Sequence, residues 1–201
     1  PSVHNIAIEG NFDDCQAIVK ALFNDLAFRD RVGLAGVNSI NWARIMAQTV
    51  YYVTAAVALG APGRAVSFCV PTGNFGDIFA GFVAKRMGLP VDRLLVATNV
   101  NDILDRTLKT GRYEQRGVRP STSPSMDIQV SSNFERLLFE VYGRDPYAVR
   151  HLMASLAQSG SFTIGERELE QIRHEFGSGA TDEAATAETI RVTLAETGEL
   201  L

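Results

Sequence analysis

Residues 71–81, PTGNFGDIFAG, have the types and spacing of a turn that binds an anion. The apolar run at residues 64–70 predicts a strand before the turn, and the apolar spacing of residues 78–87 predicts a helix after it. Gly73 and Gly76 let the backbone approach a ligand closely, and the first N–H groups of a helix carry partial positive charge. The pattern therefore predicts a phosphate or another anion bound at the turn.

Two well-known nucleotide-binding motifs do not fit this turn. A P-loop has a Lys-Ser/Thr pair after its last glycine, whereas Asp77 and Ile78 follow Gly76. The dinucleotide fingerprint is G-x-G-x-x-G, whereas Gly73 and Gly76 supply only G-x-x-G, and residues 97–99 offer no acid to bind a ribose. A simple strand-to-helix turn, in which glycine only relieves steric strain, stays open beside the phosphate site.

Three further stretches have distinctive compositions: EGNFDDCQ at residues 9–16, NSINWARI at residues 38–45, and SMDI with SSNFER within residues 125–136. Together with PTGNFGD at residues 71–77, they resemble motifs of the threonine synthase family in the family's own order. This family consists of fold-type-II pyridoxal-phosphate enzymes. Four concordant motifs are far more specific than any one turn.

The resemblance implies a cofactor, a substrate and the residues that would bind them. The cofactor would be pyridoxal 5'-phosphate, with its phosphate gripped by Gly73, Asn74, Phe75, Gly76 and Asp77. The substrate would be O-phospho-L-homoserine, with its own phosphate contacted by Asn38, Ser39, Asn41 and Arg44. An arginine guanidinium fits a phosphate with two parallel hydrogen bonds. From the residues alone, Ser39 could equally cap a helix.

The resemblance also implies a reaction and a missing residue. The family converts O-phospho-L-homoserine and water to L-threonine and phosphate, and it holds its cofactor as a Schiff base on a lysine in a Phe-Lys-Asp-like segment. Lys20, Lys85 and Lys109 lack that context and are predicted to be solvated surface charges. We therefore expect no catalytic residue in this chain, and we expect the Schiff-base lysine upstream of it.

The two ends of the chain favour the same expectation. Pro1 is not an initiator methionine, and the chain stops on Leu200 and Leu201 without a polar tail. We therefore expect an internal piece of the enzyme that is inactive alone. Two alternatives stay open. Another fold-type-II amino-acid lyase should lack the motifs at residues 38–44 and 126–136, and a noncatalytic phospho-ligand-binding homologue would have lost its lysine by substitution.

Other polar residues have two interpretations each. Residues 131–133 are two serines and an asparagine at a predicted helix start, where they could contact a ligand or cap the helix. Asp13 and Asp14 point in different directions on a helix, so they are predicted to favour helix initiation rather than to share a proton. The histidines lie far apart in sequence and receive no catalytic role: His4, His151 and His174.

Composition excludes several classes of function. The chain has 201 residues, of which 46% are hydrophobic, and this is enough for a sizeable core. No stretch reaches the roughly 18 apolar residues of a membrane span, and the start shows no signal-peptide pattern. The net charge of −4 gives no argument for nucleic acid. We expect a cytoplasmic enzyme with a small-molecule substrate, without nucleic-acid or membrane partners, and we leave the oligomeric state open.

The cysteines do not indicate a disulfide framework or a metal site. Cys15 and Cys69 are too few for a framework, and no C-x-x-C or histidine cluster is present. Both are predicted to be reduced thiols with a buried structural role.

Strands that alternate with longer helical patterns predict an α/β fold with parallel sheets and flanking helices. The resemblance implies a fold-type-II, tryptophan synthase β-like fold that is incomplete. Strands are expected at residues 5–8, 32–37, 64–70 and 93–98. Helices are expected at residues 13–28, 40–59, 78–87, 102–110, 132–142, 146–158, 165–176 and 182–196.

The same patterns suggest a division into domains. A Gly/Pro cluster at residues 60–63 is a credible boundary. By resemblance, residues 1–62 belong to a smaller domain that closes over the substrate, and residues 63–201 belong to a larger cofactor-binding domain with a helical C-terminal third. Residues 111–124 are predicted to form a long loop that is functional or mobile.

Overall fold

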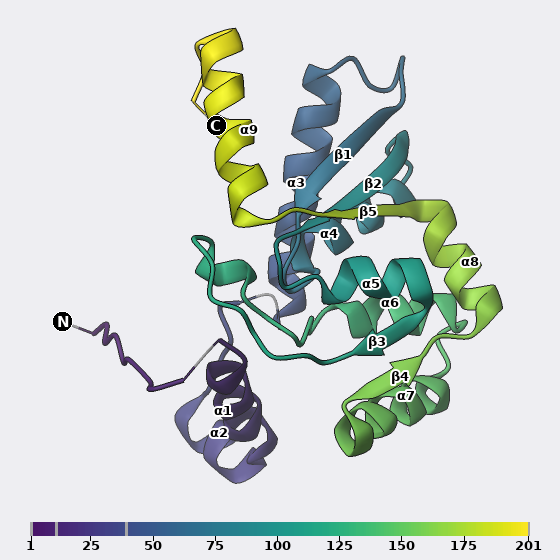
Figure 1. Ribbon diagram of the computed structural model, residues 1–201. Helices are drawn as coiled ribbons and strands as arrows, with labels where there is room; N and C mark the ends of the chain where they lie inside the picture. The colour runs from purple at the N-terminus through teal and green to yellow at the C-terminus, as the bar shows by residue number, and fades with distance from the viewer. Residues whose placement is uncertain (1, 11, 39, 201) are drawn as a thin grey trace. The chain divides into compact units, whose positions relative to one another are not determined.

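The structure is a computed structural model that describes residues 2–10, 12–38 and 40–200 (Figure 1). It divides into two compact units, Pro1–Val37 and Asn38–Leu201, and each is described by itself. No helix within the described ranges is both long and apolar enough to cross a membrane. The domain boundary predicted at residue 62 stays a prediction.

The first unit contains two helices, α1 (Phe12–Asn24) and α2 (Leu26–Val32). The helix predicted at residues 13–28 is interrupted because the Asp25 side chain accepts a hydrogen bond from Phe28 N at 3.0 Å and so starts a new helix. The strands predicted at residues 5–8 and 32–37 are wrong. A strand needs a partner, and the described part of this unit contains no paired strand.

The second unit is built on a parallel sheet, which confirms the predicted α/β class. Its strands are β1 (Val66–Pro71), β2 (Val91–Thr98) and β5 (Phe176–Ala180), in the order β1-β2-β5. Helix α4 (Gly76–Arg86) connects β1 to β2. Because β1 and β2 run parallel, their carboxyl ends lie at the same edge of the sheet.

Helix α3 (Trp42–Ala58) packs closely on α4. A side-chain carbon at Gly81 would lie 2.5 Å from the Tyr52 ring, so a glycine at this position is what permits the close approach. The Tyr52 hydroxyl donates to the backbone and carboxylate oxygens of Asp77, at 3.0 Å each. Burial, followed by the charge of Asp77, raises the pKa of Tyr52 well above its usual value. These contacts fix α3 on the first turn of α4.

The remaining helices lie close to their predicted positions. They are α5 (Ile103–Thr110), α6 (Phe134–Val141), α7 (Pro146–Ser159), α8 (Glu166–Glu175) and α9 (Glu183–Thr197), with a short 3-10 turn η1 at Pro124–Met126. The predicted loop at residues 111–124 contains β3 (Arg112–Glu114), which pairs antiparallel with β4 (Ser161–Thr163). Strand β5 lies in the third of the chain predicted to be helical, so that prediction was incomplete.

Only one face of the sheet is buried in the described residues. Val70, Leu94 and Phe176 point into a core shared with α4 to α8. Side chains alternate between the two faces of a strand, so Cys69 lies on the opposite face and is exposed. Cys15 is only partly buried. Both thiols are free, but the prediction that both are buried is wrong.

Candidate anion-binding site

The turn between β1 and α4 is shaped by Phe75. Its backbone φ is +63°, which is uncommon for a residue with a side chain. The ring is 1% exposed and packs against Phe134 and Phe176, with ring centroids 5.3 and 5.4 Å away. This packing holds the backbone in a conformation that it would otherwise rarely adopt. The left-handed residue turns the chain directly from the strand into α4.

The turn presents unused backbone donors. No backbone hydrogen bond between described residues uses the N–H groups of residues 73–78, whereas Phe79 N donates to Phe75 O at 3.1 Å. The first N–H groups of a helix point out of its end and carry partial positive charge. Donors gathered in this way suit a phosphate group. The geometry therefore favours the anion site over a turn whose glycines only relieve strain.

The segment 125–128 lies directly against this turn. A side-chain carbon at Gly73 would lie 3.1 Å from Ser125 O and 3.5 Å from Met126 Cα. The Ser131 hydroxyl donates to Gly73 O at 2.8 Å. A side chain at Gly73 would therefore crowd the backbone at residues 125 and 126, so glycine suits the close packing here.

Residues 131–133 bind the turn. Asn133 N and Nδ2 both donate to Asn74 O, at 3.0 and 3.1 Å, and the Ser132 hydroxyl lies 3.4 Å from Asn74 Oδ1. Asn133 occupies the capping position of α6, but its side chain makes no capping bond. The clearest role of residues 131–133 is to hold the turn in place. From sequence they were expected only to contact a ligand or to cap the helix.

The segment at residues 38–44 leads into α3. Asn38 Oδ1 accepts from Ile40 N at 3.1 Å, and Asn41 Oδ1 caps α3 by accepting from Ala43 N at 3.0 Å. Arg44 lies in the first turn of α3, and Ser39 lies outside the described residues. Arg136 of α6 donates to Ile40 O at 2.9 Å. This bond joins the segment to α6, and Asn133 at the start of α6 is bonded to the turn between β1 and α4.

Sequence reasoning missed a buried polar cluster around Asp127. This side chain is 8% exposed. Its carboxylate accepts from Ser121 N at 2.8 Å and Ser121 Oγ at 2.6 Å, and from Asn99 Nδ2 at 2.9 Å and Asn101 Nδ2 at 3.0 Å. Burial acts to raise its pKa, but these hydrogen bonds outweigh burial and lower the pKa below the usual value.

Asn101 extends the same cluster. Its side chain also accepts from Arg119 N and donates to Arg119 O, at 2.8 Å each. The Asn101 amide thus bonds to the backbone of Arg119 in the way that a neighbouring strand would. The long segment before Asp127 is thereby held at the carboxyl edge of β2. In the sequence, the sign of this cluster was the pair Asn99 and Asn101, which lie two residues apart directly after an apolar strand.

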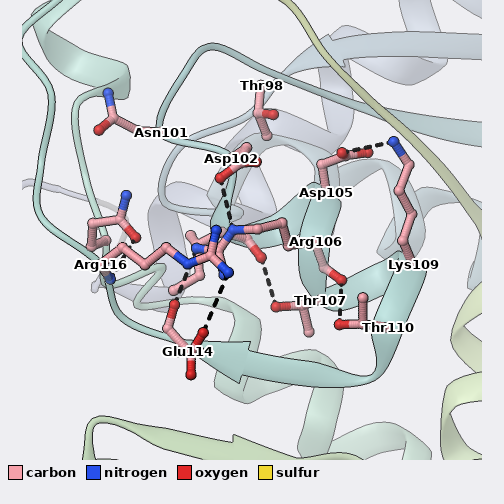
Figure 2. A network of polar contacts seen from close by, with 12 residues as sticks. Thr98, Asn101, Asp102, Asp105, Arg106, Thr107, Lys109, Thr110, Glu114 and Arg116 are labelled. Carbon is pink, nitrogen blue, oxygen red and sulfur yellow. Dashed lines mark hydrogen bonds and ion pairs between the residues drawn. The ribbon is translucent and has the colours of Figure 1, made fainter.

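The lysines are engaged with carboxylates or exposed. Lys109 Nζ lies 2.8 Å from Asp105 Oδ2. Figure 2 shows this ion pair on α5. Lys85 Nζ lies 2.6 Å from Glu175 Oε2 and donates to Asp92 O at 3.1 Å, and its side chain is only 23% exposed. Lys20 is exposed on α1. Lys20 and Lys109 match the prediction of surface charges, whereas Lys85 is more buried than predicted.

Comparisons with known proteins cover nearly the whole chain, although no family model matches it. The threonine synthase of Pseudomonas aeruginosa is 56% identical over 200 residues, which is all of this chain and 43% of that relative. A crystal structure of threonine synthase from Brucella melitensis with bound pyridoxal phosphate is 66% identical, with a TM-score of 0.90 over 99% of this chain and 43% of that one.

Yeast threonine synthase gives a similar result, with 42% identity and a TM-score of 0.79 over 92% of this chain and 38% of that one. The chain thus spans about two fifths of the length of the relatives it matches. The resemblance first indicated by four short motifs is confirmed, because the chain has the sequence and the fold-type-II architecture of a segment of the threonine synthase family.

Proposed function

We propose that this chain is part of a threonine synthase, which converts O-phospho-L-homoserine and water to L-threonine and phosphate with pyridoxal 5'-phosphate. The observation that carries the proposal is the 66% identity and TM-score of 0.90 to a threonine synthase with bound pyridoxal phosphate. Because the chain spans about two fifths of its relatives, the activity is proposed for a longer protein that contains it.

The turn after β1 would bind the cofactor phosphate. Its unused N–H groups and the left-handed backbone at Phe75 suit a phosphate, which supports this role. The proposed contacts are Gly73, Asn74, Phe75, Gly76 and Asp77. When bound, pyridoxal phosphate supplies an electron sink for carbanion chemistry. The chain's contribution is to fix the cofactor's position and orientation.

The segment before α3 would bind the phosphate of the substrate. Its proposed contacts are Asn38, Ser39, Asn41 and Arg44. The hydrogen bond from Arg136 to Ile40 and those from Asn133 to Asn74 support this assignment, because they link the segment to the cofactor turn through α6. Two neighbouring phosphate sites suit a phosphorylated substrate that meets a phosphorylated cofactor.

No residue of this chain would bond covalently to the cofactor. Lys85 and Lys109 are paired with Glu175 and Asp105, and the lysine that the family uses would lie outside the chain. The proposal includes a cytoplasmic location. It also includes a smaller domain up to residue 62 that closes over the substrate.

An assay of the longer protein tests the proposal. The protein is incubated with pyridoxal phosphate and O-phospho-L-homoserine, and threonine and phosphate are measured separately. We expect equal amounts of both products, and none without the cofactor. Phosphate without threonine would indicate another lyase of the same fold. Cofactor binding without turnover would indicate a noncatalytic homologue.

A further inference from the structure

From the geometry around α6 we propose that Arg136 is a positioning residue, which holds the backbone of the substrate segment, residues 38–44, beside the cofactor turn. It would set the separation of the two phosphate sites without itself contacting either phosphate. The names of the two phosphates rest on the proposed function, whereas the positioning contacts do not.

Arg136 contacts the substrate segment on two sides. Its Nη2 donates to Ile40 O at 2.9 Å, two residues before α3 begins. Its guanidinium also lies over the ring of Trp42, the first residue of α3, at 5.5 Å from the ring centroid. The backbone on one side and the aromatic ring on the other define the direction in which the chain enters α3.

The same guanidinium is joined to the cofactor turn. Its Nε donates to Asn133 Oδ1 at 2.9 Å, and Asn133 N and Nδ2 donate to Asn74 O at 3.0 and 3.1 Å. Ile40, Arg136, Asn133 and Asn74 therefore form one continuous path of hydrogen bonds. A shift of the substrate segment relative to the turn would break at least one of them.

The acceptors of Arg136 favour orientation over charge neutralisation. In the described parts of the chain, no carboxylate lies within ion-pair distance of its guanidinium, and both acceptors are neutral oxygens. A planar guanidinium can donate to Ile40 and Asn133 in fixed directions while it stacks on Trp42. A lysine has the same charge but lacks a planar group that donates in fixed directions.

Two variants separate positioning from charge. In the longer protein, Arg136→Lys keeps the positive charge but loses the planar guanidinium that donates in fixed directions. Arg136→Gln loses both the charge and the guanidinium. We expect both to raise the KM for O-phospho-L-homoserine by about tenfold, as expected for one lost hydrogen bond to a charged group. The dissociation constant of pyridoxal phosphate should change less than about twofold, because the turn keeps its bonds from Ser131 and Asn133. Arg144→Gln, which removes an exposed ion pair at the end of α6, is the matched control.

Hydrogen exchange gives a second measurement that does not depend on catalysis. The backbone amides of residues 40–44 should exchange faster in both Arg136 variants, whereas those of α4 should be unchanged. Wild-type KM in Arg136→Lys would overturn the proposal, because charge alone would then suffice. Unchanged exchange at residues 40–44, or an equal loss of substrate and cofactor affinity, would also overturn it.

The two proposals can fail separately. If the wild-type protein does not act on O-phospho-L-homoserine, the proposed function fails, and the exchange rates still decide the role of Arg136. If Arg136→Gln does not fold, Arg136→Lys alone decides it.

Discussion

At the scale of single residues, Phe75 shows how packing holds the turn after β1 in shape. A left-handed backbone costs a residue with a side chain about 1–2 kcal/mol. Burying an aromatic ring contributes about 2–3 kcal/mol, and the Phe75 ring is 1% exposed between two other rings. Burial therefore outweighs the backbone cost, so the packing of Phe75 stabilises the shape of the turn.

Gly76 gives a direct test of the turn. Valine at this position would push a branched side chain into the space where the backbone meets a phosphate, so Gly76→Val should weaken pyridoxal phosphate binding by at least about tenfold, the effect of one lost charge-assisted hydrogen bond. Titration of the longer protein with the cofactor measures this. Gly117→Val, at an exposed glycine with open space around it, is the control. Unchanged affinity in folded Gly76→Val would rule out the site.

Arg44 is predicted to act on the substrate and not on the cofactor. It lies in the first turn of α3, outside the cofactor turn. Arg44→Ala should raise the KM for O-phospho-L-homoserine and lower kcat/KM, with cofactor content near normal. Steady-state kinetics and cofactor absorbance measure the two effects, with Arg191→Ala on exposed α9 as the control. A loss of cofactor with unchanged KM would reverse the assignment.

At the scale of elements, local patterns predicted β1, the turn and α4 to within two residues, because an apolar strand and an apolar helix face are encoded within a few turns of chain. Strand β5, FGSGA, has two glycines and little apolar alternation. Its formation depends on pairing with β2, which lies about 80 residues away in sequence. The false strands at residues 5–8 and 32–37 show the converse, since an apolar pattern without a partner does not form a sheet.

The candidate site was likewise predictable from sequence only in part. The turn and the segments at residues 38–44 and 131–136 could be recognised from sequence because each is a short motif. The contact from Arg136 to Ile40 joins residues 96 positions apart, and four hydrogen bonds from three residues meet at Asp127. Such contacts depend on how α6 and the long segment pack. Residue type alone therefore could not predict them.

The Asp127 cluster predicts a dependence of stability on pH. Because the folded pKa of Asp127 lies below the unfolded value, its ionised form stabilises the fold above the unfolded pKa of about 3.9, and this stability is lost as the pH falls through the folded pKa. Asp127→Asn should therefore lower the unfolding temperature near pH 7, and the difference from wild type should shrink below about pH 4. A difference that does not vary with pH would show that the charge of Asp127 contributes nothing.

At the scale of the whole molecule, the chain contains the complete turn after β1 but spans only about two fifths of the length of its relatives. One face of its parallel sheet is exposed in the described residues, whereas such sheets are usually covered on both faces. We expect the isolated chain to bind an anion but not to catalyse the reaction. The turn is contiguous in sequence and would keep a weak affinity for anions.

Under the proposed function, the 201-residue chain alone is expected to make no threonine, because its lysines lack the Phe-Lys-Asp-like context that the resemblance implies for the Schiff-base lysine. Purified chain, with its mass verified, is incubated with pyridoxal phosphate and O-phospho-L-homoserine, and both products are measured. The longer protein is the positive control. Turnover by the chain alone would contradict the proposed division of roles.

If the turn after β1 holds the cofactor phosphate, a crystal structure of the longer protein with pyridoxal phosphate will show the phosphate at this turn. We expect phosphate oxygens about 2.7–3.2 Å from several backbone nitrogens of residues 73–77. A cofactor phosphate bound elsewhere, with these nitrogens facing only water, would contradict it.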